Sequence, residues 1–141
     1  MGVYRRKCES TETLKGGGWL AGTGCICCHK TNITTGETEI SRLENQVIHP
    51  YTDLLLHDMG IGLIGRPDFD ASRTEWRTQP LWGIGRIEMV NGHTNFLHDG
   101  RARNIQEAIL WHGGEAENAK EIYKQYEADD RAAILTFLNT L

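Results

Sequence analysis

The chain has 141 residues, 39% of them hydrophobic, and a formal net charge of −4. These values fit one globular domain that is large enough to fold without a metal or disulfides. The negative net charge and the lack of a dense Lys/Arg run disfavour nucleic acid as a partner. No apolar stretch approaches the roughly 20 residues of a membrane span.

The first residues, MGVYRRKCESTETLKGGG, contain no apolar core of the kind that an export signal has. Cys8 lies in this stretch, and the other three cysteines crowd into residues 25–28. Such clustering is not typical of a disulfide framework, which spreads its cysteines to close long loops. The cysteine positions point to cofactor chemistry instead.

Residues 25–29, CICCH, contain the C-x-x-C-H signature of c-type haem attachment. Two thiols three residues apart on one helical turn can reach the two vinyl groups of a single porphyrin, and the next residue then lies under the iron. The sequence therefore predicts one covalent haem c, with Cys25 and Cys28 as anchors and His29 as proximal ligand. Cys27 is interpreted as a spare thiol that risks wrong pairing during maturation.

A zinc or iron–sulfur site built from the same cysteines, with Cys8, is the competing interpretation of this loop. It needs a second ligand pair at motif spacing, such as another C-x-x-C, and the sequence has none.

Residues 31–95 are irregular, with repeated Gly, Pro, Asn and Asp. Long loops in a compact domain usually have a function, and we expect these to wrap the edge of the cofactor. Haem propionates need cationic neighbours where they are partly buried. Arg77 in this region, and Arg101 or Arg103 just after the His-Asp-Gly turn at residues 98–100, are candidates. A solvated surface arginine is the equally weighted alternative for each.

Three helices are predicted towards the C-terminus. Asn104 reads as an N-cap with Glu107 as its capping-box partner, and Gly113 and Gly114 end the helix, which predicts residues 105–112. Further helices are predicted over about 115–126 and from about 129 to the end, the last with an apolar stripe of Ile134, Phe137, Leu138 and Leu141.

The sixth iron ligand has several candidates. His112 is favoured because it projects from the last turn of the first of these helices, on the face that carries Ala108 and Ile109. His57 and Met59 come next, and Met89 also remains. His98 is expected to hold the turn beside it, and His49 and His93 to be solvated.

Four blocks in a fixed order carry a family resemblance: YTDLLLHDMG (51–60), EWRTQPLWGIG (75–85), NFLHDGRA (95–102) and EAILWHGGEA (107–116). They resemble the C-terminal haem domain of the di-haem oxidoreductase family, which is related to bacterial di-haem cytochrome c peroxidases. The resemblance covers residues 16–141 and leaves 1–15 as an N-terminal tail. It implies an all-α, cytochrome c-like domain with long haem-wrapping loops and His29 as proximal ligand.

The resemblance also bears on the distal ligand and on function. In the peroxidase relatives that ligand is a methionine at the position matching His112. A histidine in place of this methionine implies a bis-histidine haem with a lower reduction potential. Family members have an N-terminal domain with its own C-x-x-C-H, whereas this sequence has one motif. No calcium site is expected without that domain.

Three functions remain open at the level of the sequence. The favoured one is an electron-transfer domain that exchanges electrons with redox protein partners, a missing N-terminal haem domain among them. The second is a peroxidase of the di-haem type with a labile distal ligand, and the third is a haem-free zinc-binding or structural module. Because haem c is attached outside the bacterial cytoplasm, a periplasmic location is expected.

Overall fold

The computed structural model describes residues 18–141. In chain order its elements are α1 (Trp19–Gly22), η1 (Cys25–Cys27), β1 (Ile33–Thr34), β2 (Val47–Ile48), β3 (Leu56–Asp58), η2 (Ile61–Leu63), β4 (Glu75–Arg77), η3 (Ile84–Arg86), α2 (Ile87–Asn91), α3 (Ile105–Trp111), η4 (Gly114–Ala116), α4 (Glu117–Gln125) and α5 (Ala128–Leu138), where η marks a 3₁₀ turn. The tail predicted over residues 1–15 lies outside the described part of the chain.

The expected all-α architecture is wrong, because the structure is mixed. Strands β1 and β2 form one antiparallel pair, and β3 and β4 form a second, in which His57 lies opposite Trp76. All four strands fall in the region predicted as irregular loops. Backbone N–H and C=O groups need partners wherever a segment lies against the protein, and short strand pairs provide them without any helical periodicity in the sequence.

The three helices near the C-terminus follow the prediction closely. The Asn104 side chain caps α3 by accepting a hydrogen bond from the Glu107 N–H at 2.8 Å, as expected. The Glu107 carboxylate does not complete a capping box but accepts from the backbone N–H of Arg103 at 2.8 Å. Helix α3 ends at Trp111, which makes His112 its C-cap residue.

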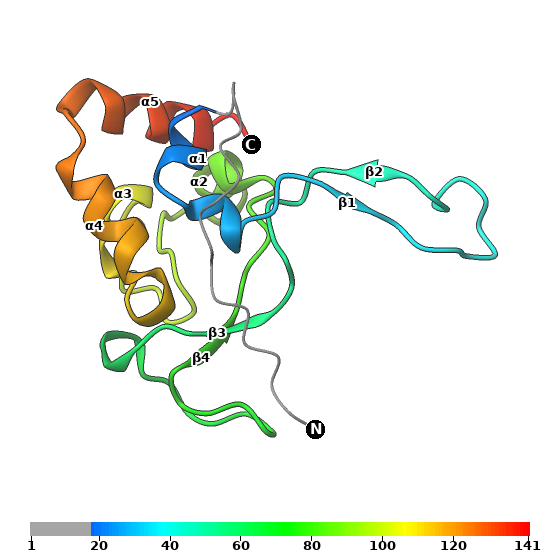
Figure 1. Cartoon of the computed structure of the whole chain (residues 1–141), viewed down its shortest axis with the longest axis horizontal. Coiled ribbons are helices and arrows are strands. Elements are labelled where there is room, and N and C mark those ends of the chain that lie inside the picture. Colours follow the sequence, from blue (N-terminus) through cyan, green and yellow to red (C-terminus); the bar gives the residue numbers. More distant parts are fainter. Residues whose placement is uncertain (1–17) are drawn as a thin grey trace.

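The apolar core lies in the helical half of the molecule. Helices α3, α4 and α5 surround it on one side, with α1 packed against α5 (Figure 1). Of the stripe predicted in α5, Ile134 and Leu138 are buried, whereas Phe137 lies at the edge and contacts the Tyr51 ring edge-on at 5.9 Å. The buried cluster consists of Phe96, Ala102, Ile105, Tyr123, Ile134 and Leu138.

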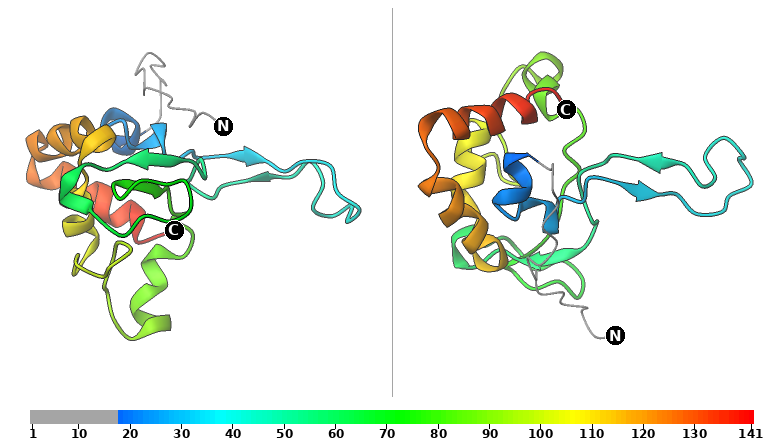
Figure 2. Two further views of the ribbon diagram at one scale, coloured as in Figure 1. Left: turned by 90° about the horizontal axis from the view of Figure 1, so that it is seen from below. Right: turned by 45° about the horizontal axis from the view of Figure 1, so that its top comes forward.

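The β1–β2 hairpin extends away from this body as an arm, as the two further views in Figure 2 also show. Its outer part exposes Ile40, Leu43 and Val47. In residues 18–141, no helix combines the length and apolar character that a transmembrane helix requires.

Candidate haem-binding site

The C-x-x-C-H stretch forms the 3₁₀ turn η1, which follows Gly24 in a left-handed conformation with φ of 83°. A 3₁₀ helix has about 3.0 residues per turn, so residues three apart lie one above the other. Cys25 and Cys28 therefore share one side of the turn, and both are free thiols. The His29 N–H donates to the Cys25 carbonyl at 3.0 Å, which ties the backbone of the histidine to the same turn.

Both free thiols are held in the protonated form. Burial raises the pKa of Cys25, and the hydrogen bond from the Thr23 hydroxyl to its sulfur, at 3.0 Å, offsets part of that rise. Burial, together with the nearby carboxylates of Asp53 and Glu115, raises the pKa of Cys28 to about 12. At neutral pH the pair is thus two neutral S–H groups.

Cys27 has a different role from its neighbours. It belongs to a disulfide, so the prediction of a spare thiol is wrong. The sequence could not show this, because whether a cysteine forms a disulfide depends on the direction in which its side chain points in the folded turn. Cys8, the extra ligand in the zinc interpretation, lies outside the described residues.

The His29 side chain is prepared for ligation by its hydrogen bond to the Tyr51 carbonyl oxygen, which lies 2.9 Å from Nδ1. A carbonyl can only accept, so Nδ1 carries the proton and Nε2 keeps its lone pair. Burial, reinforced by the nearby His112 and opposed by the Tyr51 hydrogen bond, lowers the pKa of His29 to about 4. The imidazole is therefore neutral at pH 7, the form that binds a metal.

His112 repeats this arrangement. Its Nδ1 donates to the Ala108 carbonyl at 2.7 Å, which again leaves Nε2 free, and burial lowers its pKa. His112 is also one of the groups that lower the His29 pKa, so the two imidazoles, 83 positions apart in the chain, interact electrostatically. Their roles as axial ligands stay a prediction.

His57, a weaker candidate for the sixth ligand, has both ring nitrogens engaged. Its Nε2 lies 2.9 Å from Asp53 Oδ2, and its Nδ1 lies 2.9 Å from Glu115 Oε2. Burial alone would lower the His57 pKa, but the two carboxylates outweigh it and the pKa is raised. A doubly hydrogen-bonded imidazolium offers no lone pair, which disfavours His57 as an iron ligand.

Asp53 and Glu115 were not singled out from the sequence. The spacing of Asp53 and His57, four residues apart, carries no signal in a segment that is not helical. Glu115 reaches His57 from 58 positions away, and only the folded chain shows that contact. His57 Nδ1 also lies 3.8 Å from Cys28 Sγ, and Cys28, Asp53 and His57 place potential ligand atoms within 4.8 Å of one another.

The paired His57 predicts a pH dependence of stability. Because its folded-state pKa is raised above 6.5, its contribution to folding is fully present below pH 6.5 and is lost as pH rises through the folded value. We expect the melting temperature of His57→Gln to lie below that of the wild type under mildly acidic conditions, with the gap narrowing at alkaline pH. Thermal melts across this range, with His93→Gln on an exposed loop as control, test this; a gap independent of pH would contradict it.

Gly113 and Gly114 hold the His112 loop against residues 58–60. A Cβ on Gly113 would lie 2.9 Å from the Met59 carbonyl oxygen, and one on Gly114 would overlap the Asp58 carbonyl. Gly114 also adopts φ of 55°. This close approach places Glu115 beside His57, and keeps the Met59 segment next to the proposed distal ligand.

Gly114→Ala is expected to destabilise the protein by about 2 kcal/mol or more, since it adds a left-handed alanine to a steric overlap. Chemical denaturation measures the loss. Gly36→Ala is the matched control, because Gly36 has nothing within 4 Å of its Cβ position and no positive φ. Equal stabilities for the two variants would show that the 58–60 contact does not constrain this loop.

Two of the arginines predicted to meet the propionates lie in different settings. Arg77 is exposed at the end of β4. Arg101 contacts the Asp99 carboxylate at 2.6 Å, donates to the Gly62 carbonyl at 2.5 Å and lies 4.9 Å from the centre of the Trp111 ring. Arg101 is therefore next to α3, whose C-cap is His112, whereas Arg77 is on β4.

The remaining candidates are placed as follows. Met89 on α2 has 72% of its surface exposed. The His98 ring stacks on Trp76, with 3.2 Å between the ring centres, and His49 Nδ1 donates to the Thr31 carbonyl at 2.8 Å. His93 is on an exposed loop, where Nδ1 accepts from the Asn95 N–H.

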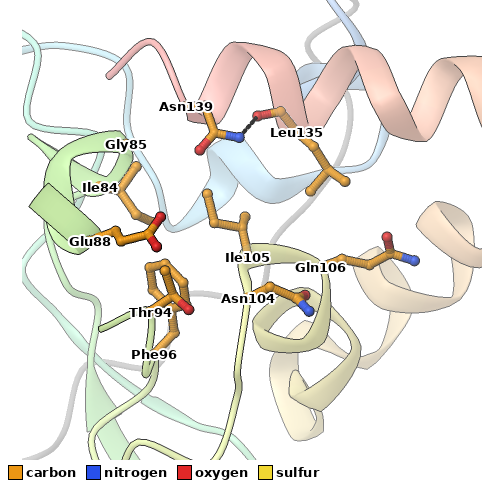
Figure 3. A pocket seen from close by; sticks show the side chains of 10 residues that line it. All are labelled: Ile84, Gly85, Glu88, Thr94, Phe96, Asn104, Ile105, Gln106, Leu135 and Asn139. Carbon is orange, nitrogen blue, oxygen red and sulfur yellow. Dashed lines mark hydrogen bonds between the residues drawn. The ribbon is translucent and has the colours of Figure 1, made fainter. Parts of the chain in front are cut away.

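A hollow of about 260 Å³ is lined by residues of α2, α3, α5 and the segments beside them. Figure 3 shows its lining, with the Asn139 amide donating to the Leu135 carbonyl. None of the predicted anchors or ligands line it, so it is separate from the candidate haem site.

The donor set fits a covalently attached haem. Two protonated thiols lie on one side of a turn, one neutral imidazole follows them directly, and a second neutral imidazole with a free Nε2 lies in the same region. These are the groups that two thioether bonds and two axial positions require.

Comparison with known families agrees with this chemistry. The family described as "Di-haem oxidoreductase, putative peroxidase" matches residues 2–141, nearly the whole chain. The chain therefore belongs to the di-haem oxidoreductase family. Neither the curated proteins nor the solved structures contain a match to it.

Proposed function

We propose that this chain is a c-type haem domain that passes electrons between redox proteins. Cys25 and Cys28 anchor one haem through thioether bonds, and His29 and His112 are its axial ligands. The observation that carries the proposal is the pair of neutral imidazoles, each with Nδ1 held by a backbone carbonyl, beside two free thiols.

The chain's own residues would set the redox properties. Bound haem supplies one-electron chemistry at its iron. The Tyr51 and Ala108 carbonyls orient the two rings, and their hydrogen bonds increase the basicity of each Nε2. Two imidazoles hold the potential below that of a His/Met pair and leave no open coordination position, which favours electron transfer over reaction with a substrate.

A periplasmic location and redox protein partners belong to the same proposal. The disulfide of Cys27 supports an oxidising compartment, because disulfides persist outside the cytoplasm. The family is di-haem, whereas these 141 residues contain one C-x-x-C-H motif. A second haem-bearing domain is therefore among the proposed partners.

The experiment that tests the proposal is expression with export in a host that has cytochrome c maturation machinery, followed by intact mass and visible spectra. We expect a mass increase of one haem, low-spin bands, and a haem that stays on the chain after denaturation and solvent extraction. A bare polypeptide mass would refute haem attachment, and bound zinc without visible absorption would favour the metal-site alternative.

A peroxidase is the second candidate, supported by the family description. It requires His112 to leave the iron so that peroxide can bind. Turnover of peroxide with a reduced electron donor separates the two functions. We expect no peroxide turnover beyond the level of free haem. Steady-state turnover accompanied by a high-spin reduced state would favour the peroxidase.

A further inference from the structure

The hollow beside α2 is built from three segments that are far apart in the sequence. Residues 84–88 form one wall, residues 94–96 with the start of α3 form the second, and the end of α5 forms the third (Figure 3). Phe96 and Ile105, which are both buried, supply apolar surface to the lining. Because no proposed haem anchor or ligand lines the hollow, a molecule bound there would be separate from the haem.

The walls of the hollow are fixed by contacts within the chain. The Thr94 hydroxyl donates to the Arg103 carbonyl at 2.8 Å and ties the second wall to the residue just before α3. Gly85 lets the first wall approach the third closely, since a Cβ on Gly85 would overlap the backbone carbonyl of Asn139. Walls that are already in place lose little conformational freedom when a ligand binds, which favours binding.

The polar groups of the lining indicate what kind of ligand fits. Among the ten described residues that line the hollow, Glu88 is the single charged one, and its carboxylate is directed into the hollow (Figure 3). The Asn139 amide N–H is used by a backbone carbonyl of its own helix, which leaves Oδ1 as an acceptor. The Thr94 hydroxyl also donates to a backbone carbonyl, so its oxygen presents lone pairs. The amides of Asn104 and Gln106 can donate or accept, so the charge of Glu88 decides in favour of a cation.

We propose that this hollow binds a primary ammonium group on a short aliphatic stem. An ammonium group has three N–H donors and no acceptor, which suits one carboxylate and two neutral oxygens. The methylene groups of the stem would lie against Phe96, Ile105 and Leu135, where their apolar surface leaves water. The net charge of −4 on the chain favours the approach of a cation. This inference goes beyond the proposed function and does not depend on it.

The test is a titration of the full chain with n-pentylammonium chloride, followed by calorimetry and by ¹⁵N NMR. We expect saturable binding, with shifts of the backbone amides of Phe96, Ile105 and Leu135. The neutral n-pentanol should bind more weakly and the anionic pentanoate should not bind. Visible spectra of the haem-loaded protein should stay unchanged, which shows that the amine does not bind iron. Equal binding of the three probes, or shifts confined to residues outside the lining, would overturn the proposal.

Glu88→Gln tests the role of the carboxylate. The glutamine keeps the shape of the side chain and removes its charge, so the affinity for n-pentylammonium should fall by about three- to tenfold. Glu37→Gln on the β1–β2 arm is the matched control, because it removes the same charge from an exposed position outside the hollow. Its affinity should equal that of the wild type. An unchanged affinity in Glu88→Gln, or an equal loss in Glu37→Gln, would overturn the proposal.

A primary ammonium group can come from a free amine or from a lysine side chain of another protein. Titration with Nα-acetyl-lysine N-methylamide separates these two sources. Binding as tight as that of n-pentylammonium would show that the hollow admits a lysine side chain, whereas binding of the free amine alone would restrict it to small amines. Failure of both ligands would overturn this proposal and leave the haem domain untouched. A chain that never carries haem would refute the haem domain and leave the ammonium site standing.

Discussion

The double variant Cys25→Ser/Cys28→Ser is expected to retain no haem after denaturation and solvent extraction, against near-complete retention in the wild type. A serine hydroxyl does not add to a vinyl group under maturation conditions, so both covalent links are lost. The single variants should keep one link each and show absorption bands displaced to longer wavelength, because one vinyl group stays conjugated with the porphyrin.

Haem staining of denaturing gels and intact mass measure this effect. His93→Ala is the matched control, since His93 is exposed on a loop outside the motif, and it should stain as the wild type does. Covalent haem that survives in the double serine variant would show that Cys27 can serve as an anchor and that the assignment of the pair is wrong.

The second large effect is expected at His112. Removing its imidazole in His112→Ala takes away one strong-field ligand, so the spectrum of the haem-loaded protein should change from low-spin to high-spin. His112→Met should keep six ligands and raise the reduction potential, by on the order of 0.1 V within the roughly 0.8 V that axial ligands span.

Visible spectra and redox titration provide the two readouts. Met89→Ala is the control, because its side chain is 72% exposed on α2 and should leave both unchanged. A low-spin spectrum that persists in His112→Ala but disappears in Met59→Ala would assign the ligand to Met59, whose segment lies against Gly113.

Local chemistry made part of this protein predictable. The C-x-x-C-H spacing predicts two anchoring thiols and the first histidine ligand, because attachment to one porphyrin requires groups that are neighbours within a single turn. The capping residue Asn104 and the glycines after His112 locate α3, since helix ends are set by side chains close in sequence. The resemblance of four blocks leads to the family that residues 2–141 match.

The wrong expectations arose where distant segments meet. The strands β1 to β4 form because the long central region folds back on itself. No alternation of apolar and polar residues in 31–95 predicts that pairing. The spare-thiol interpretation of Cys27 failed for the same reason, since a disulfide depends on which sulfur faces a partner in space.

The sequence by itself therefore determined the reactive groups of this protein: two thiols and a histidine on one turn, a second histidine at a helix end, and membership of a di-haem family. Only the tertiary structure decided the state of those groups. It supplied the carbonyls of Tyr51 and Ala108 that fix each tautomer, and the carboxylates that occupy His57. Two of these contacts, from His29 to Tyr51 and from His57 to Glu115, span tens of residues, and the burial that shifts the histidine pKa values exists only once the chain has folded.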